Sequence, residues 1–188
     1  MASSSALPIL FIDLAHHVIP GVSAALWLLY PIGLSAAAGW DLATYRIPNR
    51  LTLGLLGVTL AALSVTAWPE PRLVMPHLVS GALVFALGFI LHTLRVMGGG
   101  DVKLASVMAL WCGPAGLAPL FILTAVLGGV LTLALLSLRR WPLPPRLAAI
   151  PAIARLHAPQ SGVPYGVPLA LAGLLVFSET DLTQMLLG

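Results

Sequence analysis

The sequence contains very little charge. Only 8% of its 188 residues are Asp, Glu, Lys or Arg, whereas soluble domains carry roughly 25%. This deficit leaves too little polar surface to face water and excludes an ordinary soluble globular protein. Hydrophobic residues make up 59% of the chain, and the mean hydropathy is +1.01. The apolar stretches are long and unbroken, unlike the alternating segments of about ten residues in a membrane β-barrel. We therefore predict an all-α polytopic membrane helix bundle.

Cysteine is nearly absent as well. The single residue, Cys112, excludes an internal disulfide and a cysteine-rich zinc site, and we interpret it as a small buried hydrophobe. The histidines are scattered, and none pairs at i, i+4 spacing with a metal-type partner. They are His16, His17, His77, His92 and His157. We expect no metal site and no cofactor.

The first twenty residues lack Lys and Arg, so they lack the basic start of a cleaved signal peptide. The stretch from Ala6 to Ile19 is apolar with weak periodicity. We interpret residues 1–20 as a candidate interfacial segment.

Several apolar runs approach the length of about 20 residues that a spanning helix needs. They are 22–40, 51–68, 74–94, 115–138 and 163–180. A further apolar run, 102–113, ends at Gly113-Pro114. From Asp101 to Gly113 a helix would extend only about 20 Å, so length alone does not decide whether this run crosses the membrane.

The basic residues decide between five and six spans. If 102–113 crosses, eight of the nine Lys and Arg residues fall on one side, and only Arg72 falls on the other. The eight are Arg46, Arg50, Arg95, Lys103, Arg139, Arg140, Arg146 and Arg155. The positive-inside rule then predicts about six transmembrane helices with both termini outside. Topology thus explains the net charge of +3, and we expect the lipid bilayer, not nucleic acid, as a partner.

The chain is predicted to form one membrane domain over 1–188, with 141–162 as a cytoplasmic loop. Tryptophans stand near the proposed helix ends, where indole rings prefer the headgroup level. They are Trp40, Trp68, Trp111 and Trp141.

Asp41 and Asp101 are the two acidic residues that this topology places on the cytoplasmic side. Asp41 closes the first span and Asp101 opens the fourth, so both lie at one membrane depth. Ionisable groups there suggest function. Structural interpretations also exist: Asp41 as an interfacial carboxylate neutralised by Arg46, and Asp101 as the N-cap of the helix that follows.

The surroundings of the two acids carry a more specific signal. Asp41 begins the string DLATYRIPNRLT, and Asp101 lies in GGGDVKLASVMALWCG. These strings resemble the two signature motifs of the type IV prepilin peptidases, which are GxGD-type membrane aspartic proteases. One motif is an Asp followed by an Ile-Pro-Asn turn, and the other is Gly-x-Gly-Asp-x-Lys. The segment VPYGVPLALAGLL is similar to the family's last span, so the resemblance extends from about Trp27 to Phe177.

The resemblance implies that Asp41 and Asp101 are the catalytic pair of an aspartic endopeptidase. Peptide hydrolysis needs a base that activates water and an acid that protonates the departing amine, and two neighbouring carboxyl groups sharing one proton supply both. The other residues expected to bind substrate or shape the site are Gly98, Gly99, Gly100, Lys103, Pro48 and Asn49. The glycines allow close approach of an extended substrate, and Lys103 is expected to snorkel to the interface. Pro48 and Asn49 fit the start of the second span.

The resemblance also implies the substrate and its location. Prepilin precursors, with a short basic leader ahead of an apolar helix, would be cleaved at the cytoplasmic face of the bacterial inner membrane. The basic cytoplasmic loops hardly attract a basic leader, so recognition is expected to depend on the apolar helix and the two aspartates.

Long members of the family carry a methyltransferase segment with paired cysteines before the first motif. Here the first motif begins at residue 41, and Cys112 is the single cysteine. The chain therefore resembles the short, peptidase-only members associated with tight-adherence pilus systems, and we expect no N-methylation of the processed pilin.

A small proton-coupled transporter or channel component is the alternative, with Asp41 and Asp101 as protonation sites. It accounts for membrane acids equally well. It does not account for the glycine run before Asp101, or for both acids lying at one edge of the membrane instead of its midplane.

The topology can be tested by labelling single cysteines. A cysteine placed in the 143–160 loop should react with an impermeant thiol reagent only from the cytoplasmic side, and one at position 70 only from the outside. Labelling of both from the same side would contradict six spans.

Overall fold

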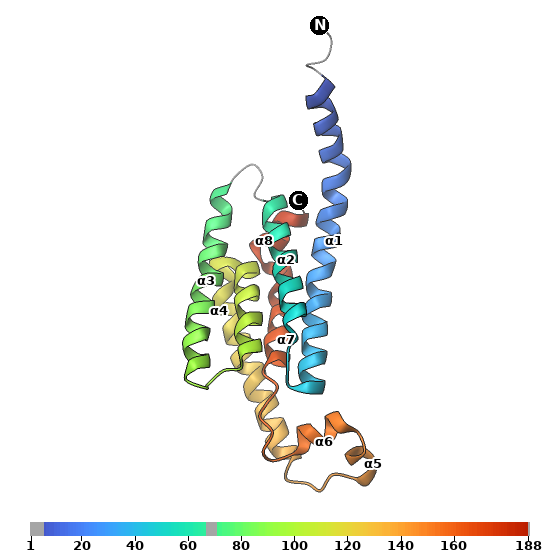
Figure 1. Ribbon diagram of the computed structural model, residues 1–188, viewed down its shortest axis with the longest axis vertical. Helices are drawn as coiled ribbons and strands as arrows, with labels where there is room; N and C mark the ends of the chain where they lie inside the picture. The colour runs from blue at the N-terminus through green and yellow to red at the C-terminus, as the bar shows by residue number, and fades with distance from the viewer. Residues whose placement is uncertain (1–5, 67–70, 188) are drawn as a thin grey trace.

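The computed structural model describes residues 6–66 and 71–187, with side chains described over 21–66 and 72–187 (Figure 1). Every secondary-structure element in these ranges is a helix, which confirms the all-α prediction. The elements are α1 (Ala6–Thr44), α2 (Asn49–Thr66), η1 (Pro71–Leu73), α3 (Val74–Thr93), α4 (Gly99–Leu138), α5 (Pro145–Ala148), α6 (Pro151–His157), α7 (Gly166–Val176), η2 (Phe177–Glu179) and α8 (Asp181–Leu187).

α4 consists of two helices joined at a kink. Gly113 has a φ of 63° and a ψ of −175°, which no helix accommodates. Figure 1 shows the chain turning back there, so that the two halves of α4 run in opposite directions. The predicted segments 102–113 and 115–138 correspond to these two halves.

The kink requires glycine and leaves one carbonyl without its helical partner. Pro114 has no N–H, so it cannot bond the Leu110 carbonyl four residues earlier. The ring of the buried His77 takes the place of the missing N–H donor, because its Nδ1 donates to the Leu110 carbonyl oxygen over 2.9 Å. A Cβ at position 113 would lie 2.8 Å from Cε1 of His77. Backbone conformation and close packing therefore both demand glycine.

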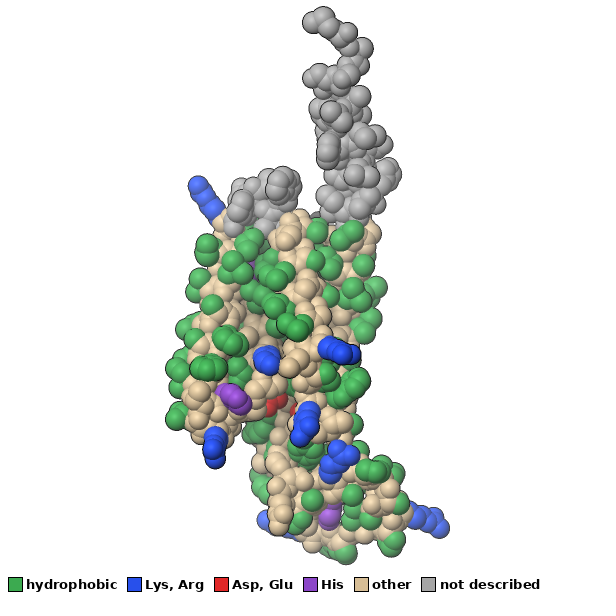
Figure 2. Space-filling view, in the orientation of Figure 1, with side chains coloured by type: hydrophobic (Ala, Val, Ile, Leu, Met, Phe, Trp, Pro, Cys, Tyr) green, Lys and Arg blue, Asp and Glu red, His purple; other side chains and the backbone are tan. Residues whose placement is uncertain are grey.

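The length and composition of the helices suit a membrane. Over the described residues, Gly21–Thr44 of α1, α2, α3 and α4 are each long and apolar enough to cross, and α7 through α8, bent by 50°, forms a further candidate. The predicted six segments correspond to these helices when α4 is divided at Gly113. Hydrophobic side chains cover the sides of the bundle in Figure 2. The segment predicted to be interfacial belongs to the same helix as the first span, because α1 begins at Ala6.

An aromatic cluster fills the core beside the kink. Trp111 is fully buried, stacks on Tyr30 with 3.8 Å between ring centroids, and donates from Nε1 to the Thr183 hydroxyl over 3.1 Å. The expected headgroup position of Trp111 is therefore wrong, since the hairpin of α4 draws this residue into the core. Trp40 and Trp141 are exposed near helix ends. Trp68 lies outside the described residues. Cys112, beside Trp111, is buried as expected.

The 141–162 segment holds two short helices, α5 and α6, at the end of the bundle where α1 ends and α4 begins (Figure 1). Arg139 ties this segment back to the bundle. Its Nε donates to the Leu156 carbonyl and its Nη2 to the Gly162 carbonyl, each over 2.9 Å. Most of the Lys and Arg side chains visible in Figure 2 lie towards this end.

The C-terminus of α3 is a Schellman motif with an unusual residue. The N–H of Val96 bonds the Leu91 carbonyl and that of Arg95 bonds the His92 carbonyl, each over 2.9 Å. Arg95 has a φ of 59°, in the left-handed region, and this position of the motif is normally glycine. A side chain in this conformation costs about 1 kcal/mol.

Replacing Arg95 with glycine should therefore stabilise the fold by up to about 1 kcal/mol, because glycine enters the left-handed region without a Cβ clash. Thermal unfolding in detergent would measure the change. Arg140→Gly is the matched control: this arginine is also exposed at a helix end, but its φ is not positive, so the change should not stabilise. An unchanged or lowered midpoint for Arg95→Gly would contradict the interpretation.

Candidate active site

Asp41 lies in the last turn of α1 and is 4% exposed. Its carboxylate Oδ2 accepts a hydrogen bond from the backbone N–H of Gly166 over 2.8 Å. Gly166 is the first residue of α7, so this N–H belongs to a helix N-terminus, which carries partial positive charge. The Gly166 N–H therefore offsets part of the cost of burying the Asp41 carboxylate.

Asp101 lies in the first turn of α4 and is partly exposed. The N-cap of this helix is Gly98, in an extended conformation and without a side-chain cap. The interpretation of Asp101 as the N-cap is therefore wrong. Its Oδ2 lies close to Gly98, where a Cβ would be 2.8 Å away. Within the described part of the chain, no donor forms a hydrogen bond with the Asp101 carboxylate, unlike that of Asp41.

Ile47 connects the two acids. A Cβ at Gly166 would lie 2.8 Å from Cδ1 of Ile47, and one at Gly100 would lie 3.3 Å from its Cβ. The buried Ile47 side chain thus packs between the residue that binds Asp41 and the residue that precedes Asp101. The charges of the two carboxyl groups are near enough to interact. Figure 2 shows acidic side-chain atoms close together among the basic ones.

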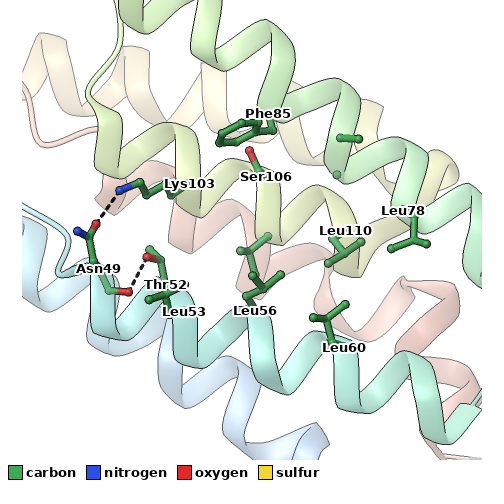
Figure 3. Close-up of a pocket in the computed structure, with 13 residues that line it drawn as sticks. Asn49, Thr52, Leu53, Leu56, Leu60, Leu78, Phe85, Lys103, Ser106 and Leu110 are labelled. Carbon is green, nitrogen blue, oxygen red and sulfur yellow. Dashed lines mark hydrogen bonds between the residues drawn. The ribbon is translucent and has the colours of Figure 1, made fainter.

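The Ile-Pro-Asn turn and the Gly-Gly-Gly-Asp-x-Lys segment also meet directly. Nζ of Lys103 donates to Oδ1 of Asn49 over 2.8 Å (Figure 3). Pro48 ends the turn, and its carbonyl accepts from the N–H groups of Leu51 and Thr52 at the start of α2. Asn49 is therefore the first residue of α2 and Pro48 directly precedes it, at the predicted start of the second span. Lys103 is exposed, as expected of a snorkelling side chain, and its ammonium group has a specific partner in the other motif.

The glycine run before Asp101 is closely packed on each side. Gly98 faces the Asp101 carboxylate and Gly100 faces Ile47. Gly99 faces the ring of His92, whose Nδ1 donates to the Met97 carbonyl over 3.0 Å. The run therefore allows three close approaches by side chains of the protein itself within a single turn of chain, and the predicted approach of a substrate stays a prediction.

Gly166, Ile47 and His92 belong to the site although none of them was predicted from the sequence to do so. Gly166 lies between two prolines in PYGVP, a pattern that predicts a turn before a helix but says nothing about a carboxylate partner. Among the described residues, no three His, Cys, Asp or Glu side chains gather where they could hold a metal ion.

Gly166→Ala should impair the site while leaving the bundle folded. The new Cβ would lie 2.7 Å from Oδ2 of Asp41, so the carboxylate must move and lose its hydrogen bond. We expect any activity that depends on Asp41 to fall at least about tenfold, and the overpacking should lower the stability of the fold by about 1–3 kcal/mol. Gly162→Ala is the control, because no atom lies within 4 Å of its added Cβ. Equal activity of the two variants would contradict this geometry.

Comparison with known proteins gives the site its context. Residues 27–133, which include both aspartates, match the type IV leader peptidase family. The chain is also similar to a prepilin leader peptidase/N-methyltransferase of Xanthomonas campestris pv. campestris, with 26% identity over 148 residues that cover 77% of this chain and 46% of that protein. The chain thus spans about half the length of this curated relative. No solved structure matches it. Because the family match covers more than half of its residues, this chain belongs to the type IV leader peptidase family.

Proposed function

We propose that this protein is a membrane aspartic endopeptidase that removes the leader peptide from prepilin-like precursors, with Asp41 and Asp101 as its catalytic pair. The observation that carries the proposal is the meeting of the two acids around Ile47, at one end of the bundle. Family membership supports the peptidase class, and the name of the Xanthomonas protein supports a prepilin substrate.

The contacts of the two carboxyl groups support different starting roles. Asp41 accepts the Gly166 N–H, which stabilises its carboxylate form. Asp101 is half-buried and accepts no hydrogen bond from the described residues, and two neighbouring carboxyl groups do not both ionise readily. We therefore assign Asp41 as the general base and Asp101 as the general acid in the first step.

The reaction then balances with these groups alone. Asp41 takes a proton from water as the water oxygen attacks the scissile carbonyl carbon. Asp101 donates its proton to the departing nitrogen as the C–N bond breaks. The products carry the released carboxylate and amine, and proton transfer between the two acids restores the starting state.

The position of the pair suits a substrate at the membrane surface. Both acids lie near the helix ends, on the side where α5, α6 and most of the basic side chains gather (Figures 1 and 2). We propose that this is the cytoplasmic face of the bacterial inner membrane and that the precursors belong to a tight-adherence pilus system. The proposal does not include methyl transfer. A proton-coupled transporter is not favoured by the family match.

Asp41→Asn and Asp101→Asn should each abolish leader cleavage, because an amide can neither take up nor release the proton. Because the two acids act together, losing either one should lower the rate of cleavage about a thousandfold or more. The double variant should be hardly less active than a single one. The measurement is cleavage of a fluorogenic prepilin peptide by purified variants at matched protein amounts. Wild-type activity should follow a bell-shaped pH profile whose limbs belong to the pair.

Asp181→Asn is the control, since this exposed acid starts α8 away from the site and should leave turnover unchanged. Near-normal cleavage by either single variant of the pair would refute the aspartic mechanism. Absence of cleavage by the wild-type enzyme would refute the proposed function.

A further inference from the structure

A groove of about 460 Å³ runs along the bundle between α2 and α3, with the first half of α4 as its floor (Figure 3). Each helix contributes one stripe of residues. On α2 the stripe is Asn49, Leu53, Leu56 and Leu60, and the lining residues of α3 and α4 repeat at i, i+3, i+4 and i+7. The stripe on α2 extends about 16 Å, which is roughly three helical turns.

One end of the groove adjoins the candidate active site. Figure 3 shows the hydrogen-bonded pair of Lys103 and Asn49 at that end, and Leu60 and Leu78 at the other. Lys103 follows Asp101 by two residues, and Asn49 follows Ile47 by two. The groove therefore begins at the same end of the bundle as the two acids, two residues along the chain from Asp101, and leads away from that end along the apolar helices.

Beyond this end, the lining residues that the structure describes offer no free polar group to an occupant. The Thr52 hydroxyl donates to the Asn49 carbonyl over 3.0 Å, and the Ser106 hydroxyl donates to the Val102 carbonyl over 2.7 Å. Both hydroxyls are thus satisfied within their own helices, and the other lining side chains are apolar. An occupant must therefore be apolar along most of its length and polar only where it reaches Lys103.

The shape of the groove suits a helix. Two small residues, Ala82 and Ser106, lie between larger side chains such as Leu56 and Phe85, whereas Gly81 is buried against Leu110 of α4. Small residues such as Ala82 and Ser106 allow the backbone of another helix to approach closely in a membrane. Stripes at i, i+3, i+4 and i+7 spacing form the ridges between which a further helix packs.

We propose that this groove docks the apolar helix of the precursor substrate and so presents the peptide bond ahead of that helix to Asp41 and Asp101. This inference rests on the proposed function and extends it, because it says where the enzyme holds the part of the substrate that is not cleaved. The helix lies between α2 and α3 with its polar end at Lys103. Recognition of a substrate by a helix in a groove then precedes cleavage.

A kinetic comparison tests the proposal with two substrates. One is a prepilin precursor with its apolar helix, and the other is a soluble peptide with the same cleavage sequence but no helix. Ala82→Phe should raise KM for the precursor about tenfold or more, because the phenyl ring fills space in the groove that the helix would occupy. Cleavage of the soluble peptide should stay unchanged. Ala125→Phe is the matched control, because Ala125 is also exposed on the bundle but does not line the groove.

Cross-linking provides a second measurement that does not depend on filling the groove. In the Asp101→Asn background, which should retain uncleaved precursor, Leu53→Cys should form a cross-link with a cysteine in the precursor helix. Leu133→Cys should not, although the two leucines are 64% and 66% exposed. The buried Cys112 should contribute little background.

The outcomes separate the two proposals. If the wild-type enzyme cleaves both substrates, but Ala82→Phe behaves as Ala125→Phe and Leu53→Cys gives no cross-link, the docking proposal fails and the proposed function stands. Loss of co-purified lipid from Ala82→Phe without a change in KM would likewise overturn it, since the groove would then hold acyl chains. If the wild-type enzyme cleaves neither substrate, the proposed function itself fails.

Discussion

The hydrogen bond between the Gly166 N–H and the Asp41 carboxylate joins parts of the chain that are 125 residues apart. A buried carboxylate in an apolar bundle is costly unless a donor reaches it, so the end of α1 depends on the start of α7. The position of the start of α7 depends in turn on the contacts of the residues just before it, Gly162 and Tyr165. Arg139 binds the Gly162 carbonyl, and the Tyr165 ring packs on Gly128, where a Cβ would lie 2.9 Å away. Three helices of the bundle, α1, α4 and α7, thus contribute to the surroundings of one acid.

The arrangement of helices was largely predictable because it follows from local composition. Apolar runs of sufficient length indicated the helices, and Gly113-Pro114 marked the reversal within α4 since one residue has no Cβ and the next has no N–H. The basic loops placed Asp41 and Asp101 at one end. These features depend on neighbouring residues in the sequence, which is why periodicity and charge patterns report them.

The contacts that complete the site were not predictable in the same way. Gly166 acts through its backbone N–H, Ile47 through the shape of its side chain, and His92 through the ring that packs on Gly99. None of these functions requires a distinctive local pattern, because each depends on a partner from another helix. For Trp111 the local pattern gave a wrong prediction. Its position near a helix end suggested a ring at the membrane interface, but the ring is buried in the core and stacks on Tyr30.

The short first half of α4 has a consequence for the other end of the molecule. This helix reverses at Gly113 before reaching the level at which α3 begins (Figure 1), and α8 packs beside the reversal. Thr183 of α8 receives the Trp111 N–H, while Leu182 and Leu186 are buried. Residues beyond the last predicted apolar run, 163–180, are therefore part of the hydrophobic core. Truncation of residues 181–187 for purification would expose Trp111. An affinity tag is better inserted in the exposed 141–162 segment.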